Sequence, residues 1–472
     1  MNPDRESITE PSRQLDVAFD ADVVIAGGGP AGVSAAIAAA MTQKQSGRPV
    51  SVLLLESQGQ LGGVWTSGLL SWIIDSENKP GILTQLYAQL DRLRDQMHEP
   101  PTLYQKGRTY DAELMKWVLE QWITRLGVKV LLHTRVAEAR LDQDQNLTHV
   151  VIESCSGRQA IAGKVFVDCT GDGVLARHAG CDFAIGSHDD QNCGSRLQPM
   201  SLMGIVTGVN REQLKPYYNI GHEPWAVPKQ RLLTAIRDAG LEPSYTRPTL
   251  FEIYPDMFGM MVNHQYAQHP HVVDHVSDAT ISGRDEINRI VQALRQTGGI
   301  WRDLRLIATA NHIGIRESTR PQGCYQITLD DLVQGREHDD AICRCTFGVD
   351  VHATSKQSAG GGIEQSPVKR TLPYDIPYRA LIASQVGQLL FAGRCISGDF
   401  WAHASYRVTG NAVATGEAAG CAAALGVIHN CSPRDLNFAQ RLKPALDQLR
   451  ESCCVALPDT DQCLISTFTE SV

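Results

Sequence analysis

The sequence lacks several features that would place the protein in other classes. No run of 18 consecutive apolar residues occurs, so we expect neither a membrane-spanning helix nor a membrane partner. Basic residues are in deficit, because 43 Lys and Arg stand against 52 Asp and Glu and the formal net charge is −9. Proteins that bind nucleic acids present a basic surface. This charge balance therefore argues against a nucleic-acid partner.

The chain also lacks an export signal and a regular cysteine framework. Residues 1–20 are polar and charged without an apolar core segment, which favours a loose N-terminal tail and a cytoplasmic protein. The 13 cysteines stand at irregular spacings, so we expect reduced thiols rather than a disulfide scaffold. Cys343 and Cys345, like Cys453 and Cys454, have no second pair at zinc-ligand spacing, and no metal site is expected.

One stretch near the N-terminus carries a specific signal. An apolar, β-branched run over residues 23–26 is followed by small residues with helical character up to residue 40. Between them stands the pattern Gly27-x-Gly29-x-x-Gly32. In such a pattern Gly27 makes the tight turn, Gly29 lets the backbone approach a pyrophosphate, and Gly32 allows close packing of helix on strand. The free amides of the helix N-terminus then hold the anion.

A second apolar run, over residues 51–55, predicts the next strand and ends at Glu56, 24 residues after Gly32. The Glu56 carboxylate is placed to accept a hydrogen bond from a ribose hydroxyl. The complete unit predicts a dinucleotide site, the alternative being a glycine turn that only packs. No second complete fingerprint occurs, because Gly360–Gly362 lack a flanking strand and helix. We therefore expect no separate NAD(P)H domain.

The next part of the chain predicts more of the same domain. Apolar residues at helical spacing predict an amphipathic helix that begins after the N-cap Asp111 and ends before Gly127. Short strands are predicted over 128–132, 136–141, 149–153 and 165–168. The spacing of these strands indicates a small β-meander inserted before the chain returns to the parallel sheet.

The alternation of strands and helices breaks after about residue 186, where strand candidates lie at 203–206, 251–254 and 260–263, and it returns at 388–394. A chain of 472 residues exceeds one typical core. We predict an α/β protein in which a parallel sheet with helices and an inserted β-meander forms a Rossmann-like domain, joined by a smaller α+β substrate domain. The predicted ranges are a tail at 1–20, the nucleotide-binding domain at 21–185 and 385–430, the substrate domain at 186–384 and a C-terminal helical segment at 431–472.

Several motifs in one order along the chain resemble those of the FAD-dependent oxidoreductase family, which has an FAD-binding fold of the glutathione-reductase type. The resemblance extends from residue 21 to about 455. It rests on Gly27–Ala36, Glu56, Leu61–Gly63, Val165–Gly173, Gln198–Met203, Gly314–Ser318, Tyr374–Arg379 and Phe391–Ser397. It implies FAD as the cofactor, a Rossmann-like FAD-binding domain and redox chemistry on a small molecule.

By position, the resemblance also implies the residues that hold FAD. Those near the adenosine diphosphate are Gly27, Gly29, Pro30, Ala31 and Gly32 at the pyrophosphate, Glu56 at the adenosine ribose and Val136 at the adenine. Those near the flavin are Gly62, Gly63 and Thr66 along the isoalloxazine, Gly171 and Asp172 in a supporting loop, and Gly393 and Arg394 at the ribityl chain. The helix after Val408 is expected to point its N-terminus at the flavin pyrimidine edge and to bring Gly410 and Asn411 there.

The substrate side departs from the pattern of the family. Many relatives carry His-Glu where this chain has Phe400-Trp401, and an aliphatic residue where it has His403. The base that would take a hydroxyl or amine proton is therefore open. His403 is favoured because it lies between the FAD segment and the flavin-facing helix. The alternatives are His312, His264 and Tyr378.

Arg316 and Arg407 match the family pattern and complete, with His403, the predicted catalytic set. Their guanidinium groups are suited to clamp an anionic substrate or to steady the reduced flavin. Arg320 and Arg379 are further candidates, and an ordinary ion pair is the alternative for each arginine. Glu317 is expected to be a partner of its neighbour Arg316.

Together these features predict an FAD-dependent dehydrogenase or oxidase that moves a hydride from a small polar organic substrate to the flavin, which oxygen or an unidentified acceptor reoxidises. The alternative is a flavoprotein that serves tRNA modification or electron transfer, because related folds occur in tRNA-modifying flavoproteins. The acidic balance and the lack of a basic arm favour the first. Homo-oligomerisation stays open.

Overall fold

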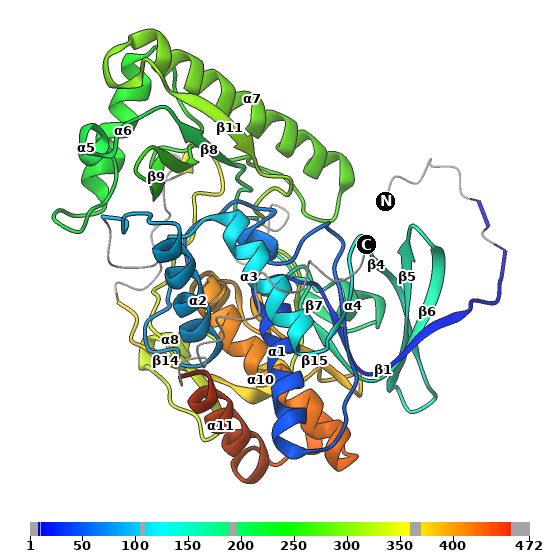
Figure 1. Cartoon of the computed structure of the whole chain (residues 1–472). Coiled ribbons are helices and arrows are strands. Elements are labelled where there is room, and N and C mark those ends of the chain that lie inside the picture. Colours follow the sequence, from blue (N-terminus) through cyan, green and yellow to red (C-terminus); the bar gives the residue numbers. More distant parts are fainter. Residues whose placement is uncertain (1–7, 10, 104–108, 188–195, 359–369, 455–472) are drawn as a thin grey trace, which may run out of the picture.

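A computed structural model describes the chain except for residues 1–7, 10, 104–108, 188–195, 359–369 and 455–472. Figure 1 shows a larger lower part that contains the blue N-terminal and the orange and red C-terminal elements. A smaller upper part consists mainly of green elements from the middle of the chain. The two ends of the sequence therefore build one body, and the middle builds another.

The lower part is organised around a seven-stranded sheet with the order β3-β2-β1-β6-β5-β4, in which β15 also pairs with β6. The pairs β1–β2, β2–β3, β1–β6 and β6–β15 are parallel. The inner strands are apolar and buried, as expected for a parallel sheet covered on both faces. The α/β class is confirmed. The strands are β1 (Val17–Ala26), β2 (Val52–Leu55), β3 (Lys129–Leu131), β4 (Arg135–Leu141), β5 (Leu147–Ser154), β6 (Gly157–Asp168) and β15 (Leu389–Phe391).

The meander consists of β4, β5 and β6, which pair antiparallel as predicted. The start of the sheet differs from the prediction, because β1 begins at Val17 and this residue pairs with Ala160. Residues 17–20, assigned to the tail, therefore belong to a strand. They are only partly buried, so their sequence carries little of the apolar signal that marks the rest of β1.

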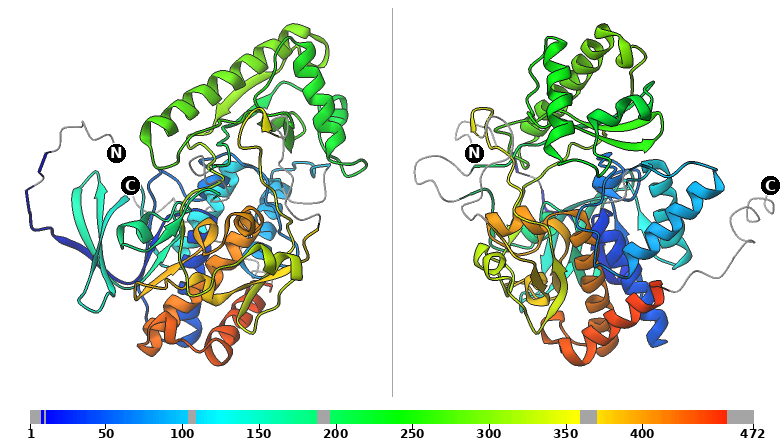
Figure 2. Two further views of the ribbon diagram at one scale, coloured as in Figure 1. Left: turned by 180° about the vertical axis from the view of Figure 1, so that it is seen from behind. Right: turned by 90° about the vertical axis from the view of Figure 1, so that its left-hand side faces the viewer.

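Two helices of small residues, α1 (Pro30–Ser46) and α10 (Thr409–His429), lie side by side against the sheet (Figures 1 and 2). A Cβ added to Gly416 would lie 2.2 Å from the Ala31 carbonyl oxygen, and one added to Gly420 would lie 2.1 Å from that of Ala35. Among the described residues α10 is the one helix long and apolar enough to cross a membrane, but 83% of that segment is buried inside the protein. It is a core helix.

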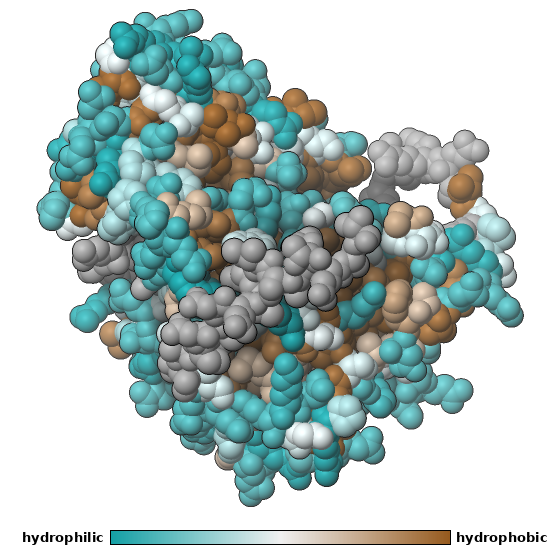
Figure 3. Space-filling model, viewed as in Figure 1, coloured by the Kyte–Doolittle hydropathy of each residue, from teal (hydrophilic) through white to brown (hydrophobic). Residues whose placement is uncertain are grey.

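The upper part contains a four-stranded antiparallel sheet with the order β11-β8-β10-β9. Two amphipathic helices cover it and turn hydrophilic side chains outward, which dominate the outer surface of this part in Figure 3. The strand candidates of the sequence lie here, although the third begins and ends earlier than predicted. The elements are β8 (Met203–Thr207), β9 (Thr249–Tyr254), β10 (Met257–Met261), β11 (Arg305–Thr309), α5 (Arg211–Leu214), α6 (Ala226–Asp238) and α7 (Val273–Thr297).

The predicted helix after Asp111 is α3, and the Asp111 carboxylate caps it by accepting from the Glu113 amide at 2.7 Å. The predicted C-terminal helical segment, 431–472, includes α11, and residues 455–472 lie outside the described residues. The other elements are α2 (Ile82–Gln96), α3 (Ala112–Arg125), α4 (Val174–His178), β7 (Phe183–Ala184), β12 (Arg320–Pro321), α8 (Leu329–Gln334), β13 (Ala341–Cys345), β14 (Tyr374–Pro377), α9 (Phe400–Tyr406) and α11 (Lys443–Cys454).

The hydrophobic core divides at a different place from the predicted domains. The core of the upper part draws on residues 200–315, whereas Ile327, Ile342 and Tyr374 pack into the core of the lower part. The predicted substrate range 186–384 thus includes a segment that packs with the nucleotide-binding sheet. This segment forms short antiparallel strand pairs such as β13–β14, and such pairs are also typical of the sequence of an α+β domain. Its sequence therefore does not reveal that it covers the lower part.

Candidate functional site

A connected cavity of about 830 Å³ begins at the carboxyl ends of β1, β2 and β6 and extends to the upper sheet. Its walls include the glycine turn after β1 and, at the other end, Met203 of β8, Phe251 of β9 and Met261 of β10. Ligands of open α/β sheets bind at the carboxyl ends of the parallel strands. Both parts of the molecule therefore contribute to one site.

The glycine turn has the form predicted for a pyrophosphate cradle. Gly27 has a φ of +97°, and a Cβ at Gly32 would lie 1.7 Å from the Gly27 carbonyl oxygen. At Gly29 the nearest heavy atom to an added Cβ is 3.9 Å away, so the space beside this residue is open to the cavity. The first turn of α1 has neither a capping side chain nor an acidic residue. Its amides are available to an anion.

Glu56 holds the second edge of this cradle. Its carboxylate is buried and accepts hydrogen bonds from the amides of Gly28 and Gln58, both at 2.7 Å. Glu56 lines the cavity together with Thr134 and Val136 at the start of the meander. The predicted ribose and adenine positions are therefore neighbours along one wall.

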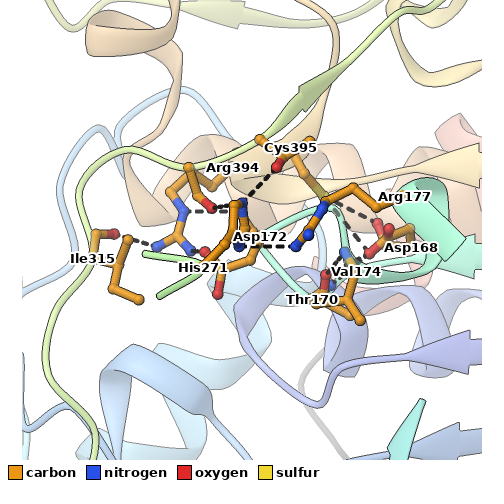
Figure 4. Close-up of polar contacts among 12 residues, drawn as sticks. Asp168, Thr170, Asp172, Val174, Arg177, His271, Ile315, Arg394 and Cys395 are labelled. Carbon is orange, nitrogen blue, oxygen red and sulfur yellow. Dashed lines mark hydrogen bonds and ion pairs between the residues drawn. The ribbon is translucent and has the colours of Figure 1, made fainter. Parts of the chain in front are cut away.

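A polar network fixes the opposite wall (Figure 4). Arg394 donates from Nε to the Gly171 carbonyl at 2.9 Å, donates to the Ile315 carbonyl and pairs with Asp172. The buried Asp168 carboxylate orders the turn before them by accepting from the Thr170 amide at 3.0 Å and from an amide of α4. The network joins the second glycine turn, the segment after β15 and the segment after β11, and it sets the shape of the wall.

The start of α10 forms the end of the nucleotide-binding half. Thr409 lines the cavity, and its hydroxyl is buried without a hydrogen-bond partner among the described residues. Gly410 does not line the cavity, because its amide donates to the Ile74 carbonyl at 3.0 Å and an added Cβ would strike residue 75. The Asn411 side chain donates from Nδ2 to the Cys345 sulfur at 3.1 Å. An unpartnered hydroxyl at a helix N-terminus is suited to a polar ligand edge.

Most of the predicted cofactor residues line the cavity, and a smaller set supports them from outside it. The lining residues are Gly27, Gly29, Pro30, Ala31, Glu56, Gly63, Val136, Gly171, Asp172, Gly393 and Arg394. Gly32, Gly62, Thr66, Gly410 and Asn411 do not line it. Gly62 donates its amide to the Gly28 carbonyl at 2.8 Å, and Thr66 donates its hydroxyl to the Leu61 carbonyl at 2.6 Å. Their contacts shape the two loops that meet at the cradle.

Two arginines lie at the distal end of the cavity. Arg316 donates from Nη1 to the Pro199 carbonyl at 2.7 Å and to the Ser201 hydroxyl at 2.8 Å. Arg407 donates from Nη2 to the Asp350 carbonyl at 2.9 Å, while its Nε is buried without a partner in the described part of the chain. The structure thus brings together the two arginines that the sequence predicted and leaves part of their donor capacity for a ligand.

Asp350 and His352, which the sequence analysis did not select, lie between these arginines and the upper sheet. Asp350 Oδ2 is 3.2 Å from His352 Nε2, and His352 Nδ1 is 3.0 Å from His264 Nε2. Burial and the nearby Arg316 lower the pKa of His352 to about 4. Burial alone would raise the pKa of Asp350, but His352 and Arg407 hold it well below its usual range. At neutral pH the site contains a carboxylate beside a neutral imidazole.

The remaining walls of the distal end are aromatic and carry one further cation. The rings of Trp72 and Trp225 meet edge-on at 5.4 Å, and Phe251 lies 5.5 Å from Trp72. Lys229 Nζ is 5.0 Å from the centre of the Trp225 ring. Burial lowers the pKa of Lys229 to about 8, although Asp350 opposes this. Three cations and one carboxylate within aromatic walls favour an organic anion.

His403 is placed differently from the two arginines with which it was grouped. It is fully buried in α9 and does not line the cavity, and neither ring nitrogen has a hydrogen-bond partner among the described residues. Burial and Arg320 lower its pKa well below the usual value. The geometry does not bring His403 to the substrate end, and its catalytic role stays a prediction.

Among the other candidates, some lie at the cavity and some do not. His312 lines the cavity, and His264 contacts it through His352. Tyr378 is buried and donates to the Pro433 carbonyl at 2.8 Å, while Arg379 pairs with Asp340 at 2.9 Å. Glu317 pairs with Arg320 at 2.7 Å rather than with Arg316 as expected. Arg316 donates instead to Pro199 and Ser201.

The sequence around Asp350 and His352 contains one pattern that could have indicated that the two side chains lie together. In Val349-Asp350-Val351-His352 polar and apolar residues alternate, which puts both polar side chains on the same side of an extended segment. Nothing comparable marks Lys229 or Tyr245, which also line the cavity and whose positions depend on how the upper part folds over the lower.

The fold and the cavity define an α/β enzyme with one dinucleotide cradle joined to a substrate chamber. The chain belongs to the FAD dependent oxidoreductase family, which matches residues 22–446. FAD is its cofactor, and it is an oxidoreductase. No curated protein sequence matches the chain.

Solved structures of flavoenzymes resemble the chain distantly. A geranylgeranyl bacteriochlorophyll reductase-like protein from Thermoplasma acidophilum has 11% identity and a TM-score of 0.41, over 92% of this chain and 83% of that one. The p-nitrophenol 4-monooxygenase PnpA from Pseudomonas putida has 11% identity and a TM-score of 0.43, over 92% and 88%. The myxobacterial chondrochloren halogenase CndH has 10% identity and a TM-score of 0.43, over 92% and 79%.

Proposed function

We propose that this flavoenzyme oxidises a small organic anion that carries an alcohol or amine carbon. The observation that supports this most directly is the continuity of the cavity from the nucleotide cradle to a chamber with Arg316, Arg407 and Lys229. A ligand held by these cations would lie beside the end of the cradle. Aromatic side chains complete the walls and keep water away from the reacting carbon.

The residues present fit FAD, because the glycine turn is open at Gly29 and the Thr409 hydroxyl at the far end is buried with no partner among the residues that the structure describes. Gly29 and Ala31 would hold the diphosphate, Glu56 the ribose, and Thr409 the polar edge of the flavin. When bound, FAD supplies the acceptor for two electrons. The protein supplies orientation and charge.

The arginines would hold the substrate by an anionic group. Arg407 has an Nε without a partner in the described segments of the chain, and Arg316 is fixed by Pro199 and Ser201 so that its remaining donors keep one orientation. Guanidinium groups suit carboxylates because they donate two parallel hydrogen bonds. We infer that a carboxylate is the anchor, and that its binding positions the carbon from which the hydride leaves.

The sequence has one complete glycine fingerprint, so we propose that substrate reduces the flavin directly and that oxygen or an acceptor protein reoxidises it. We also propose a cytoplasmic location, as expected for reduced thiols. Nucleic acid is not among the proposed partners, since the formal net charge is −9.

The test is anaerobic mixing of the purified flavoprotein with a panel of 2-hydroxy and 2-amino carboxylates, with the flavin absorbance as readout. We expect at least one carboxylate to bleach the flavin, and Arg316→Met to raise the concentration needed at least tenfold, as the loss of a charged hydrogen bond implies. Glu242→Gln, on the surface, is the matched control. Bleaching by NADPH but by no carboxylate would contradict the proposal.

A further inference from the structure

One cation of the substrate chamber has no counter-ion in the described part of the chain. Arg407 Nη2 pairs with the Asp350 carboxylate at 3.5 Å. Lys229 also lines the cavity, but its ammonium makes neither an ion pair nor a hydrogen bond with a described residue. Its contact is the Trp225 ring, whose centre is 5.0 Å from Nζ. The wall of the chamber therefore presents an ammonium whose donors are unused.

An unpaired ammonium in this position is unfavourable by itself. Burial lowers the pKa of Lys229 to about 8, Asp350 opposes this shift, and the exposed Arg247 adds to it. Lys229 therefore stays charged at pH 7. A charge that leaves water without an opposite charge costs free energy, and an aromatic ring compensates only part of that cost. A ligand that brings a negative group to Lys229 would supply the missing charge.

Lys229 is separated from the two arginines of the chamber. Burial and then Arg407 lower the pKa of Arg316 to about 10, so these two guanidinium groups lie close together. The charged groups that shift the pKa of Lys229 are Asp350 and Arg247, and neither arginine of the chamber is among them. Lys229 also comes from α6 in the upper part, whereas Arg407 follows α9 in the lower part. The chamber thus has two separate positive ends.

An apolar surface connects these two ends. The sulfur of Met261, on β10, is 3.7 Å from Arg316 Nη2. Phe251, on the neighbouring strand β9, lines the cavity from the same sheet. The Phe251 ring lies 5.5 Å from that of Trp72, which meets the Trp225 ring at 5.4 Å. The surface therefore begins at an arginine and ends at the ring that carries the ammonium.

The charges at this end of the cavity agree with a ligand that carries two negative charges. One carboxylate, that of Asp350, stands against three cations, which are Arg316, Arg407 and Lys229. His352 is neutral at pH 7, because burial and Arg316 lower its pKa to about 4. Two positive charges therefore remain. A monoanion would leave one of them unbalanced, whereas a dianion compensates both.

We propose that the chamber binds an organic dianion, a carboxylate with a second acidic group at the other end of an apolar spacer. Arg316 and Arg407 bind the carboxylate beside the reacting carbon, and Lys229 binds the second acidic group. The spacer lies along Met261 and Phe251. This inference rests on the proposed function and narrows its class of substrate.

The first test measures binding without turnover. The FAD-loaded enzyme is titrated at pH 7 with unbranched dicarboxylates from succinate to suberate and with the monocarboxylates of the same chain lengths, and calorimetry gives the dissociation constants. We expect the best dicarboxylate to bind about tenfold more tightly than its matched monocarboxylate, as one additional charged hydrogen bond implies. If no dicarboxylate binds more tightly than its matched monocarboxylate, the proposal is wrong.

Substitutions on α6 test the assignment of the second acidic group to Lys229. In Lys229→Met the advantage of the dicarboxylate should disappear, whereas Lys229→Arg keeps the charge and should retain most of it. Arg231→Met is the matched control, because Arg231 belongs to the same helix, pairs with Glu223 and does not line the cavity. An advantage that persists in Lys229→Met would overturn the assignment.

The second test separates this inference from the proposed function. Among 2-hydroxy and 2-amino carboxylates, those with a second acidic group should reduce the flavin at lower concentrations. Lys229→Met should raise the concentration for the half-maximal rate about tenfold and leave the limiting rate nearly unchanged. If monocarboxylates reduce the flavin equally well, the dianion is wrong and the proposed function stands. If no carboxylate reduces the flavin but the dicarboxylate advantage depends on Lys229, the proposed oxidation fails and the second anion site stands.

Discussion

At the scale of single residues, substitutions at two glycines of the same turn are expected to have different effects, one on cofactor binding and the other on folding. The space beside Gly29 is open, with the nearest atom 3.9 Å from an added Cβ, whereas Gly32 has none. Gly29→Glu should therefore fold but purify without flavin, because its carboxylate would occupy the place of the diphosphate. Absorbance of the purified protein and its circular dichroism check both points. Gly29→Ala, which fits, is the control. Retention of full flavin by Gly29→Glu would contradict the cradle.

Lys229 makes the binding of anions depend on pH. Burial lowers its pKa to about 8, so the ammonium is charged below this pH and neutral above it. We expect the affinity for benzoate, a simple aromatic carboxylate, to fall as the pH rises through about 8. Titration of the flavin spectrum with benzoate on either side of that pH measures the change. Lys229→Arg stays charged, and its affinity should remain level. Equal pH dependence in both proteins would exclude Lys229 as the source.

At the scale of elements, the contact between α1 and α10 ties the cofactor cradle to the core. An added Cβ at Gly420 would lie 2.1 Å from the Ala35 carbonyl oxygen, so the two helices must separate. Gly420→Ala should lower the free energy of unfolding by about 3 kcal/mol, the usual upper range for overpacking. Urea unfolding of the FAD-loaded protein measures it. In Gly259→Ala the new methyl meets atoms no closer than 3.7 Å, and the stability should stay nearly unchanged.

The sequence predicted those elements whose signal is local. The glycine turn, the strand before Glu56 and the helix capped by Asp111 follow from periodicity and turn chemistry within some twenty residues, and the structure confirms them. The start of β1 at Val17 was missed because these residues are half-exposed and owe their strand conformation to pairing with β6. The predicted substrate range 186–384 includes Ile327, Ile342 and Tyr374, which pack into the lower core, because short strand pairs do not reveal which core they cover.

At the scale of the whole molecule, the substrate chamber is the part that no local pattern could predict. Its side chains come from widely separated regions of the chain, represented by Trp72, Lys229, Arg316, Asp350 and Arg407, and tertiary packing alone brings them together. Arg316 and Arg407 were identified through family motifs, whereas His352 has no such motif. His403 lies close in sequence to the predicted FAD segments, but its side chain is buried and does not line the cavity, since proximity along the chain does not fix the direction of a side chain.

FAD should also hold the two parts of the molecule together. The cavity is lined by the glycine turn of the lower part and by Met203 and Phe251 of the upper part. We therefore expect a dinucleotide bound in it to extend far enough to contact both cores. A ligand at 100 times its dissociation constant stabilises the folded state by about 2.7 kcal/mol. Removal of FAD should therefore lower the Tm by several degrees, and hydrogen exchange should increase in β8 and β9 as well as at the cradle. Gly29→Glu should show the lower Tm and no response to added FAD. If added FAD protects only the amides of the lower part, the cofactor does not bridge the two cores.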